Sequence, residues 1–316
     1  MSARPPESVL WDFLRGALMT RALAQVADLD VAGALADGPV AVGDLAEAVG
    51  ADPDMLHRLL RALASDGVFE ETDPAVFRNT AVSELLRTPS QRAFAHLFGG
   101  AWHRAAGELE AVTGRPTFPT TFGTDFWSWL SEHPAERCAF DIAMVDGYES
   151  RAERLASLDW NGDETIVDVG GGNGSLLVEF LRERPSLRGI VFDLPETVRD
   201  DDLGDRIEFV AGNFFERVPI ADAYILSTIL HDWDDESATA ILRTIGASAP
   251  PATRLVILDA VVAAGNQPDG TKWLDLLLLA LLGGRERSEP QWRALLDGAG
   301  LEAVSIEDGL LEARWH

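Results

Sequence analysis

Residues 165–175, which read TIVDVGGGNGS, constrain the fold of this chain more than any other stretch. The first five are mostly apolar and β-branched, as in a buried strand. Glycines follow at positions 170, 171, 172 and 174, and an apolar, helix-compatible pattern resumes at 176–181. A strand that breaks at glycines and re-enters as a helix brings free backbone N–H groups close to a ligand. The stretch therefore predicts an α/β domain with a ligand-binding loop.

The spacing of these glycines separates two classes of ligand. A dinucleotide-binding fingerprint reads G-x-G-x-x-G, and Ser175 stands where its third glycine would be. The run from Asp168 through Gly170 and Gly172 instead resembles the acidic-x-G-x-G-x-G signature of class I methyltransferases that use S-adenosylmethionine. The Asp168 carboxylate suits an ammonium group or a bound water better than a phosphate. A plain glycine-rich turn is the simpler alternative.

Composition limits the partners of the chain. It has 316 residues and a formal net charge of −26, which repels nucleic acid and anionic membrane surfaces. Cys138 is the single cysteine, so we expect neither a disulfide framework nor a cysteine-based metal site, and we assign no metal ligands. We find no signal-peptide pattern, and the longest apolar run, 274–282, is interrupted by Asp275 and too short to span a bilayer. We expect a cytoplasmic protein without nucleic-acid or membrane partners.

Residues 1–90 predict a winged-helix domain. Helical apolar spacing covers 8–37, helices follow at 42–49 and 54–66, and residues 68–69 and 76–77 flank a hairpin turn. DNA binding is the usual function of such a domain. However, this part contains 7 Arg and 14 Asp or Glu, the opposite of what phosphate contacts need. Because the apolar helix near 8–28 exceeds what a small domain buries, we interpret residues 1–90 as a dimerisation domain that forms a homodimer.

Residues 91–160 predict a mainly helical segment that is rich in aromatic side chains. Aromatic residues at helical spacing usually form a core, but their density also suits the wall of a pocket for a flat aromatic ligand. Phe140 and Met144 are the candidates for such wall residues. We therefore expect this segment to link the two domains and to contribute to a substrate pocket.

Residues 161–316 alternate strands and helices and close with a hairpin at 301–306 and 310–313. Asp193 ends the second strand, where a carboxylate can accept hydrogen bonds from a ribose diol. The third strand, 206–210, leads to Asn213 and Phe214, whose amide oxygen and ring suit an adenine amine and an adenine face. The fourth, predicted over 223–230, ends at His231, where open α/β sheets place ligands.

Four motifs occur in order after the acidic winged helix: VDVGGGNG, FDLP, LHDWDDE and LLGGRERS. Together they resemble the small-molecule O-methyltransferases of the caffeic acid and hydroxyindole type, and their bacterial relatives in aromatic natural-product pathways. The resemblance covers nearly the whole chain. It implies a Rossmann-like methyltransferase sheet with a C-terminal antiparallel hairpin, S-adenosyl-L-methionine as cofactor, dimerisation through the N-terminal helices, and methylation of a phenolic oxygen.

The resemblance also implies the roles of individual residues. His231 matches the general base, and Glu286 and Asp259 match the acids that orient its imidazole; Asp259 is one methylene shorter than the usual glutamate. Asp232 is expected to bind substrate hydroxyls or to cap the next helix. The family usually has Asp where Asn213 stands and often Lys where Ser227 stands. The positions that match cofactor contacts are Asp168, Gly170, Gly172, Asp193, Asn213, Phe214 and Ser227.

Three other functions stay open at this point. The fold could use S-adenosylmethionine for decarboxylation, hydroxylation or a pericyclic step, although an intact His231 with Glu286 favours methyl transfer. A ligand-sensing transcription regulator is disfavoured by the acidity of the winged helix. An NAD oxidoreductase is disfavoured by Ser175 in place of the third fingerprint glycine.

Overall fold

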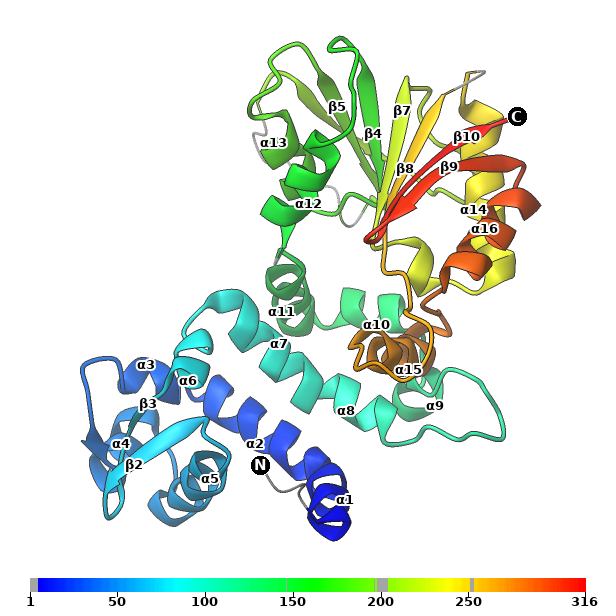
Figure 1. Cartoon of the computed structure of the whole chain (residues 1–316). Helices are drawn as coiled ribbons and strands as arrows, with labels where there is room; N and C mark the ends of the chain where they lie inside the picture. The colour runs from blue at the N-terminus through cyan, green and yellow to red at the C-terminus, as the bar shows by residue number, and fades with distance from the viewer. Residues whose placement is uncertain (1–4, 146, 196, 198–203, 251–252) are drawn as a thin grey trace. The chain divides into compact units, whose positions relative to one another are not determined.

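The computed structural model describes residues 5–145, 147–195, 197, 204–250 and 253–316 (Figure 1). The chain forms two compact units, one of Met1–Glu108 with Glu132–Asp146 and one of Leu109–Ser131 with Gly147–His316. The domain boundaries expected after residues 90 and 160 are not tested by this division and stay a prediction. None of the helices in the described residues is long and apolar enough to cross a membrane.

The N-terminal unit is mostly helical and has a small antiparallel sheet, as predicted for a winged helix. Strands β1 (Val40–Ala41), β2 (Phe69–Asp73) and β3 (Val76–Asn79) pair in the order β1-β3-β2. The helices are α1 (Pro6–Leu14), α2 (Gly16–Asp28), α3 (Val31–Ala34), α4 (Val42–Val49), α5 (Pro53–Ser65), α6 (Ala81–Leu85), α7 (Pro89–Gly99), α8 (Ala101–Ala106) and α11 (Pro134–Met144).

Local sequence signals explain the helix that precedes the hairpin. The Asp52 side chain accepts a hydrogen bond of 2.8 Å from the Met55 amide at the start of α5, and Pro53 occupies the first turn. Leucines recur at helical spacing and are buried with the β2 and β3 aromatics: Leu56, Leu60, Leu63, Phe69 and Phe77. The predicted winged-helix core is therefore formed.

The C-terminal unit contains a seven-stranded sheet in the order β6-β5-β4-β7-β8-β10-β9. Five strands are parallel, and the hairpin β9–β10 pairs antiparallel along β8, as predicted. The strands are β4 (Thr165–Val169), β5 (Arg188–Asp193), β6 (Ile207–Ala211), β7 (Ala223–Ser227), β8 (Arg254–Leu258), β9 (Leu301–Glu307) and β10 (Leu310–Trp315). The helices are α9 (Phe118–Phe122), α10 (Phe126–Glu132), α12 (Tyr148–Ala156), α13 (Ser175–Leu181), α14 (Asp235–Ser248), α15 (Thr271–Leu282) and α16 (Glu289–Gly298), with a 3-10 turn η1 (Leu230–Asp232).

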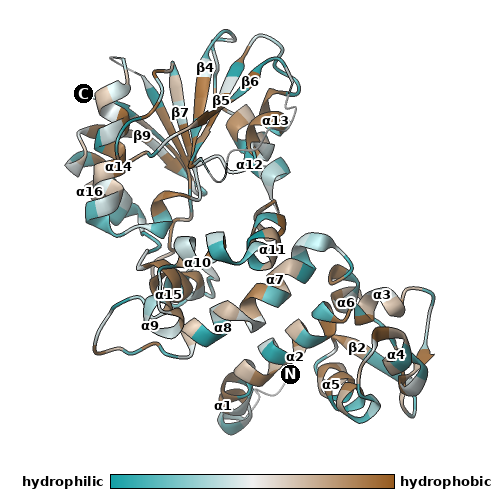
Figure 2. Ribbon diagram, turned by 180° about the vertical axis from the view of Figure 1, so that it is seen from behind, coloured by the Kyte–Doolittle hydropathy of each residue, from teal (hydrophilic) through white to brown (hydrophobic). Residues whose placement is uncertain are grey.

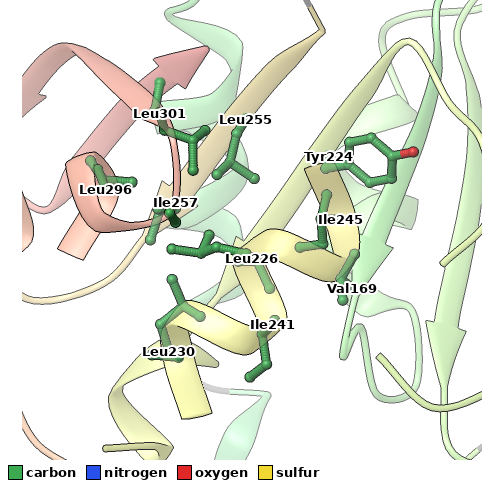
Figure 3. Packing of buried hydrophobic residues seen from close by; sticks show 14 of the residues in the cluster. Val169, Tyr224, Leu226, Leu230, Ile241, Ile245, Leu255, Ile257, Leu296 and Leu301 are labelled. Carbon is green, nitrogen blue, oxygen red and sulfur yellow. The ribbon is translucent and has the colours of Figure 1, made fainter. Parts of the chain in front are cut away.

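The central strands are buried on both faces, as their almost continuous apolar sequences require. Alternate residues of β7 belong to different cores: Leu226 packs with α14 and α16, and Ile225 packs with α12 and α13. Figure 2 shows the apolar colouring of β4 and β7, and Figure 3 shows the core on the α14 side. Two packed cores hold the carboxyl ends of these strands in place.

One predicted boundary is wrong. The strand expected over 223–230 ends at Ser227, and the chain continues through Thr228, which has a φ of 54°, into η1. Ile229 and Leu230 still pack against the α14 core. Their apolar character therefore comes from core packing outside the sheet, which an apolar run alone does not distinguish from a longer strand.

We expect Leu226→Ala to lower the free energy of unfolding by about 2–5 kcal/mol, because the side chain is fully buried at the centre of the sheet. Urea unfolding followed by circular dichroism measures this change. Val304→Ala on β9 is the control; Val304 is 54% exposed, and its loss should cost no more than about 0.5 kcal/mol. Equal costs for the two variants would contradict the assigned core.

Candidate functional site

The site residues predicted in the C-terminal unit gather where parallel strands end. Residues paired across the sheet show this register: Asp168 of β4 lies beside Ile225 of β7, and Ser227 of β7 lies beside Leu258 of β8. Asp259 directly follows β8, and Asp193 ends β5. The carboxyl edge of such a sheet is where α/β proteins bind ligands.

The glycine loop lies against the end of β5. The Gly170 amide donates to the Phe192 carbonyl at 2.7 Å, and the Gly172 amide donates to Asp193 Oδ2 at 2.8 Å. Gly170 has a φ of 75°, and a Cβ there would come within 2.5 Å of Ile229. A Cβ on Gly172 would have no atom within 4 Å. One glycine is thus needed for packing, and the other leaves an open approach to the backbone.

Asp168 is buried beneath this loop and its charge is poorly compensated. The residue is 1% exposed, and its Oδ2 has no hydrogen-bond partner. Burial, together with the charge of Asp193, raises the pKa of Asp168 to about 7, while Arg151 opposes this rise. A buried acceptor without a donor fits a ligand that brings an ammonium group.

Arg151 is a cation at this edge that the sequence analysis missed. It comes from α12, its Nη1 donates to Ser227 Oγ at 3.4 Å, and its guanidinium lies 4.7 Å from the centre of the Tyr148 ring. The same charge opposes the raised pKa of Asp168. No motif indicated this residue, because only the packing of α12 beside the sheet brings it there.

Asn213 and Phe214 follow β6, next to the end of β5. Asn213 Oδ1 accepts a hydrogen bond of 2.9 Å from the Phe215 amide, so one of its lone pairs already stabilises the turn. The Phe214 ring meets Trp233 edge to face, with ring centres 5.9 Å apart. The Gly212 amide donates to the Asp193 carbonyl at 2.8 Å, which ties this turn to β5.

His231, on η1, is surrounded by carboxylates. Its Nδ1 lies 3.0 Å from Glu286 Oε1 and 3.3 Å from Asp259 Oδ1, and its Nε2 lies 3.5 Å from Asp232 Oδ1. Asp259 does reach the imidazole despite its shorter side chain, but neither of its oxygens has a hydrogen-bond partner. The Glu286 contact is the hydrogen bond, and Asp259 acts through its charge.

The carboxylates change the proton affinity of the imidazole. Burial disfavours the charged ring, but Asp259, Asp232 and Glu286 outweigh burial and raise the pKa of His231 to about 10. Burial also raises the pKa of Asp232 to about 7 and that of Asp259 to about 6. The arrangement can therefore hold a proton on the imidazole once one has been transferred to it.

Residues 284–287, which follow α15, contact the loop that carries His231. The Arg285 amide donates to the His231 carbonyl at 2.9 Å. The Arg287 side chain is fully buried and donates to the carbonyls of Leu230 and Trp233, each at 2.8 Å. Arg287 was not singled out from the sequence, although the motif LLGGRERS contains it.

Two predicted residues lie elsewhere. Phe140 and Met144 are half-buried on α11 of the N-terminal unit, and their place in a pocket wall stays a prediction. Ligand atoms of His231, Asp259 and Glu286 lie within 4.8 Å of one another, so the expectation of no metal site also stays a prediction.

Comparison with known families accounts for this arrangement. The model of an O-methyltransferase domain matches residues 102–302, and the model of an O-methyltransferase dimerisation domain matches residues 11–89.

Individual relatives agree with these matches. The chain is 36% identical to a phenazine O-methyltransferase from Lysobacter antibioticus over 313 residues, which cover 94% of this chain and 92% of that protein. The structure of this chain resembles that of human N-acetylserotonin methyltransferase in complex with S-adenosylmethionine, with a TM-score of 0.88, 26% identity and 99% of each chain covered. It also resembles an O-methyltransferase from neocarzinostatin biosynthesis bound to S-adenosylmethionine and 2-hydroxy-5-methyl naphthoic acid, with a TM-score of 0.82 and 32% identity over 94% of this chain and 96% of that one.

We expect Asp168→Asn to stabilise the ligand-free protein more at pH 8 than at pH 5. A carboxyl group whose pKa rises on folding adds its full stability below the unfolded pKa of 3.8 and loses it as the pH rises through about 7. The neutral amide avoids this loss. Thermal unfolding at both pH values measures the difference in Tm, with exposed Asp297→Asn as the control. A gain at pH 8 no larger than at pH 5 would contradict the buried, uncompensated charge.

Proposed function

The chain belongs to the family of S-adenosylmethionine-dependent O-methyltransferases, and on that basis we propose that it methylates a phenolic hydroxyl of a small aromatic natural product with His231 as general base. The observation that carries the proposal is the hydrogen bond between His231 and Glu286, at the sheet edge that also holds the glycine loop. The relatives described above are methyltransferases, so a non-methylating reaction is not favoured.

The residues at the glycine loop suit the cofactor. We assign the unpartnered Asp168 Oδ2 to its ammonium group and Arg151 with Ser227 to its carboxylate. Asp193 would accept from the ribose hydroxyls, and Phe214 would lie against the adenine face. Gly172 leaves the backbone open to the cofactor, Gly170 lets the loop pack against Ile229, and Asn213 would lie beside the adenine. When bound, S-adenosylmethionine supplies an electrophilic methyl group on a sulfonium.

His231 is oriented to take a proton through Nε2. A carboxylate can only accept a hydrogen bond, so the imidazole must carry its proton on Nδ1 to donate to Glu286. In the neutral ring this leaves the lone pair of Nε2 for the phenolic O–H, whose pKa is ~10 by analogy with tyrosine. Because the pKa of His231 is itself raised to about 10, the charged ring must release a proton before it can act as the base. As the O–H bond breaks, the proton stays on Nε2 and the oxygen becomes nucleophilic. Asp259 and Glu286 stabilise the imidazolium that results.

The aromatic character of the acceptor is supported by the relatives and by the site. The neocarzinostatin enzyme was solved with a hydroxylated naphthoic acid. Asp232 lies beside Nε2 of His231, where its carboxylate can accept from a second substituent of the acceptor. Phe140 and Met144 are proposed as wall residues of the pocket.

A homodimer is the proposed assembly, in the cytoplasm and without nucleic-acid or membrane partners. The match to a dimerisation domain supports it, and so does a row of exposed apolar residues at the start of the chain. These residues are 58–76% exposed: Leu10, Trp11, Phe13, Leu14 and Leu18. A second copy of the chain would remove them from water.

We expect His231→Ala to lower kcat for phenol methylation by about 10²–10⁴-fold, the usual contribution of a positioned general base. The affinity for S-adenosylhomocysteine should stay within about threefold, because the assigned cofactor contacts are on other residues. Calorimetric titration measures that affinity, with NADH as the ligand that should not bind. His316→Ala, at the chain end, is the control. Turnover that persists in His231→Ala would remove the base assignment.

We expect the double variant Phe13→Glu with Leu18→Glu to be monomeric where the wild type is dimeric, since both side chains are more than 70% exposed in the single chain. Sedimentation velocity at micromolar concentration reports the mass. Ile220→Glu, which replaces an apolar residue 74% exposed on the C-terminal unit, should leave the dimer intact. A dimer that survives the double variant would place the interface elsewhere.

A further inference from the structure

Asp275 is an unusual residue for its helix. Helix α15 reads TKWLDLLLLALL, and Asp275 is the one acidic side chain within it. Asp has a low helix propensity, and a half-buried carboxylate among leucines loses solvation. Its Oδ1 accepts a hydrogen bond of 2.7 Å from the backbone amide of Glu286, eleven residues further along the chain. The carboxylate therefore ties α15 to the segment that supplies a catalytic side chain.

Each residue of that segment, from 284 to 287, contacts the loop that carries His231. Gly284 passes so close that a Cβ would overlap the His231 carbonyl, and the Arg285 amide donates to the same carbonyl. Arg287 holds the carbonyls on either side through its guanidinium. Glu286 reaches the ring itself, through Oε1. Its backbone amide is held from α15, by Asp275.

We propose that Asp275 is a positioning residue, which fixes the main chain of Glu286 so that the Glu286 carboxylate meets Nδ1 of His231. This inference rests on the proposed role of His231 as general base. The 2.7 Å bond to a carboxylate is of the charge-assisted kind, which is stronger than a bond between neutral groups. Without it the Glu286 amide would lose its acceptor, and the backbone would move to find another.

A small displacement is enough to matter. Glu286 Oε1 is 3.0 Å from Nδ1, and a shift of about 1 Å would break this hydrogen bond. Asp259 offers no replacement, because it already lies 3.3 Å away without a hydrogen bond. Losing the Glu286 contact would weaken the stabilisation of the imidazolium and leave the ring free to turn. Misplacement on this scale costs about 10²-fold in rate.

Variants at Asp275 separate the hydrogen bond from the charge. Asp275→Ala removes the acceptor and adds helix propensity, so the fold should be retained. We expect its kcat to fall roughly 10- to 100-fold, with the affinity for S-adenosylhomocysteine unchanged. Asp275→Asn keeps an oxygen acceptor but loses the charge, and its kcat should stay within about threefold of wild type. Asp297→Ala, which removes an exposed carboxylate from α16, is the control and should match wild type.

A second readout distinguishes positioning from general damage. The imidazole of His231 is faced by Asp232 of its own turn, by Asp259 after β8 and by Glu286, whose backbone amide Asp275 of α15 holds. Proteins labelled with ¹³C at histidine report its titration by NMR, with His231→Ala assigning the signal among six histidines. In Asp275→Ala the ring should titrate at lower pH than in wild type, because the Glu286 bond favours the charged ring. In Asp275→Asn it should titrate near the wild-type value.

The outcomes decide the inference. A lower titration of His231 together with a lower kcat in Asp275→Ala alone supports it. An unchanged titration, or an Asn variant as impaired as the Ala variant, would overturn it. The NMR measurement needs no turnover. If His231→Ala still methylated phenols, the base assignment would fail while the titration still showed whether Asp275 holds Glu286.

Discussion

The loop that carries His231 depends on a buried guanidinium. A fully buried cation is costly unless its N–H groups are paired and a negative charge is near. Arg287 meets both conditions: it donates to the carbonyls of Leu230 and Trp233 and to Asp235 Oδ1, and its charge also favours the ionised form of Asp259. The carbonyls it holds lie on either side of residues 231–232. The loop geometry is thus fixed by an electrostatic requirement as well as by apolar packing.

The site contains buried polar atoms that lower the stability of the fold, and apolar packing in the rest of the domain offsets this loss. Asp168 Oδ2, both oxygens of Asp259 and Glu286 Oε2 are buried without hydrogen-bond partners, each at a cost in stability. Asp168 lies in β4 and Asp259 follows β8, strands that are buried on both faces, so two apolar cores hold these two side chains in place. Polar groups fixed this way need little reorganisation when charge develops nearby. The protein therefore loses some folding stability but holds polar groups that are already oriented when charge develops, as at other functional sites.

The motifs predicted much of this, and packing decided the rest. The glycine loop and the C-terminal hairpin follow from short sequence patterns, and the pairing of His231 with Glu286 follows from the resemblance that the motifs carry. Arg151 and Asp275 were missed, since each lies on a helix whose facing the sequence does not fix. The end of β7 was misplaced because Ile229 and Leu230 are apolar for reasons of packing outside the sheet.

Because Asp259 is one methylene shorter than the usual glutamate, the orientation of the His231 ring depends mainly on the position of Glu286. Two acids near Nδ1 could share the task of orienting the ring, but Asp259 approaches to 3.3 Å without hydrogen-bond geometry. A charge without a directed bond stabilises the imidazolium in any ring orientation, whereas a hydrogen bond also selects the tautomer. In this chain that selection depends on Glu286 alone among the described contacts of Nδ1. On the proposed mechanism, a fixed backbone at Glu286, held from α15, is then required by the chemistry.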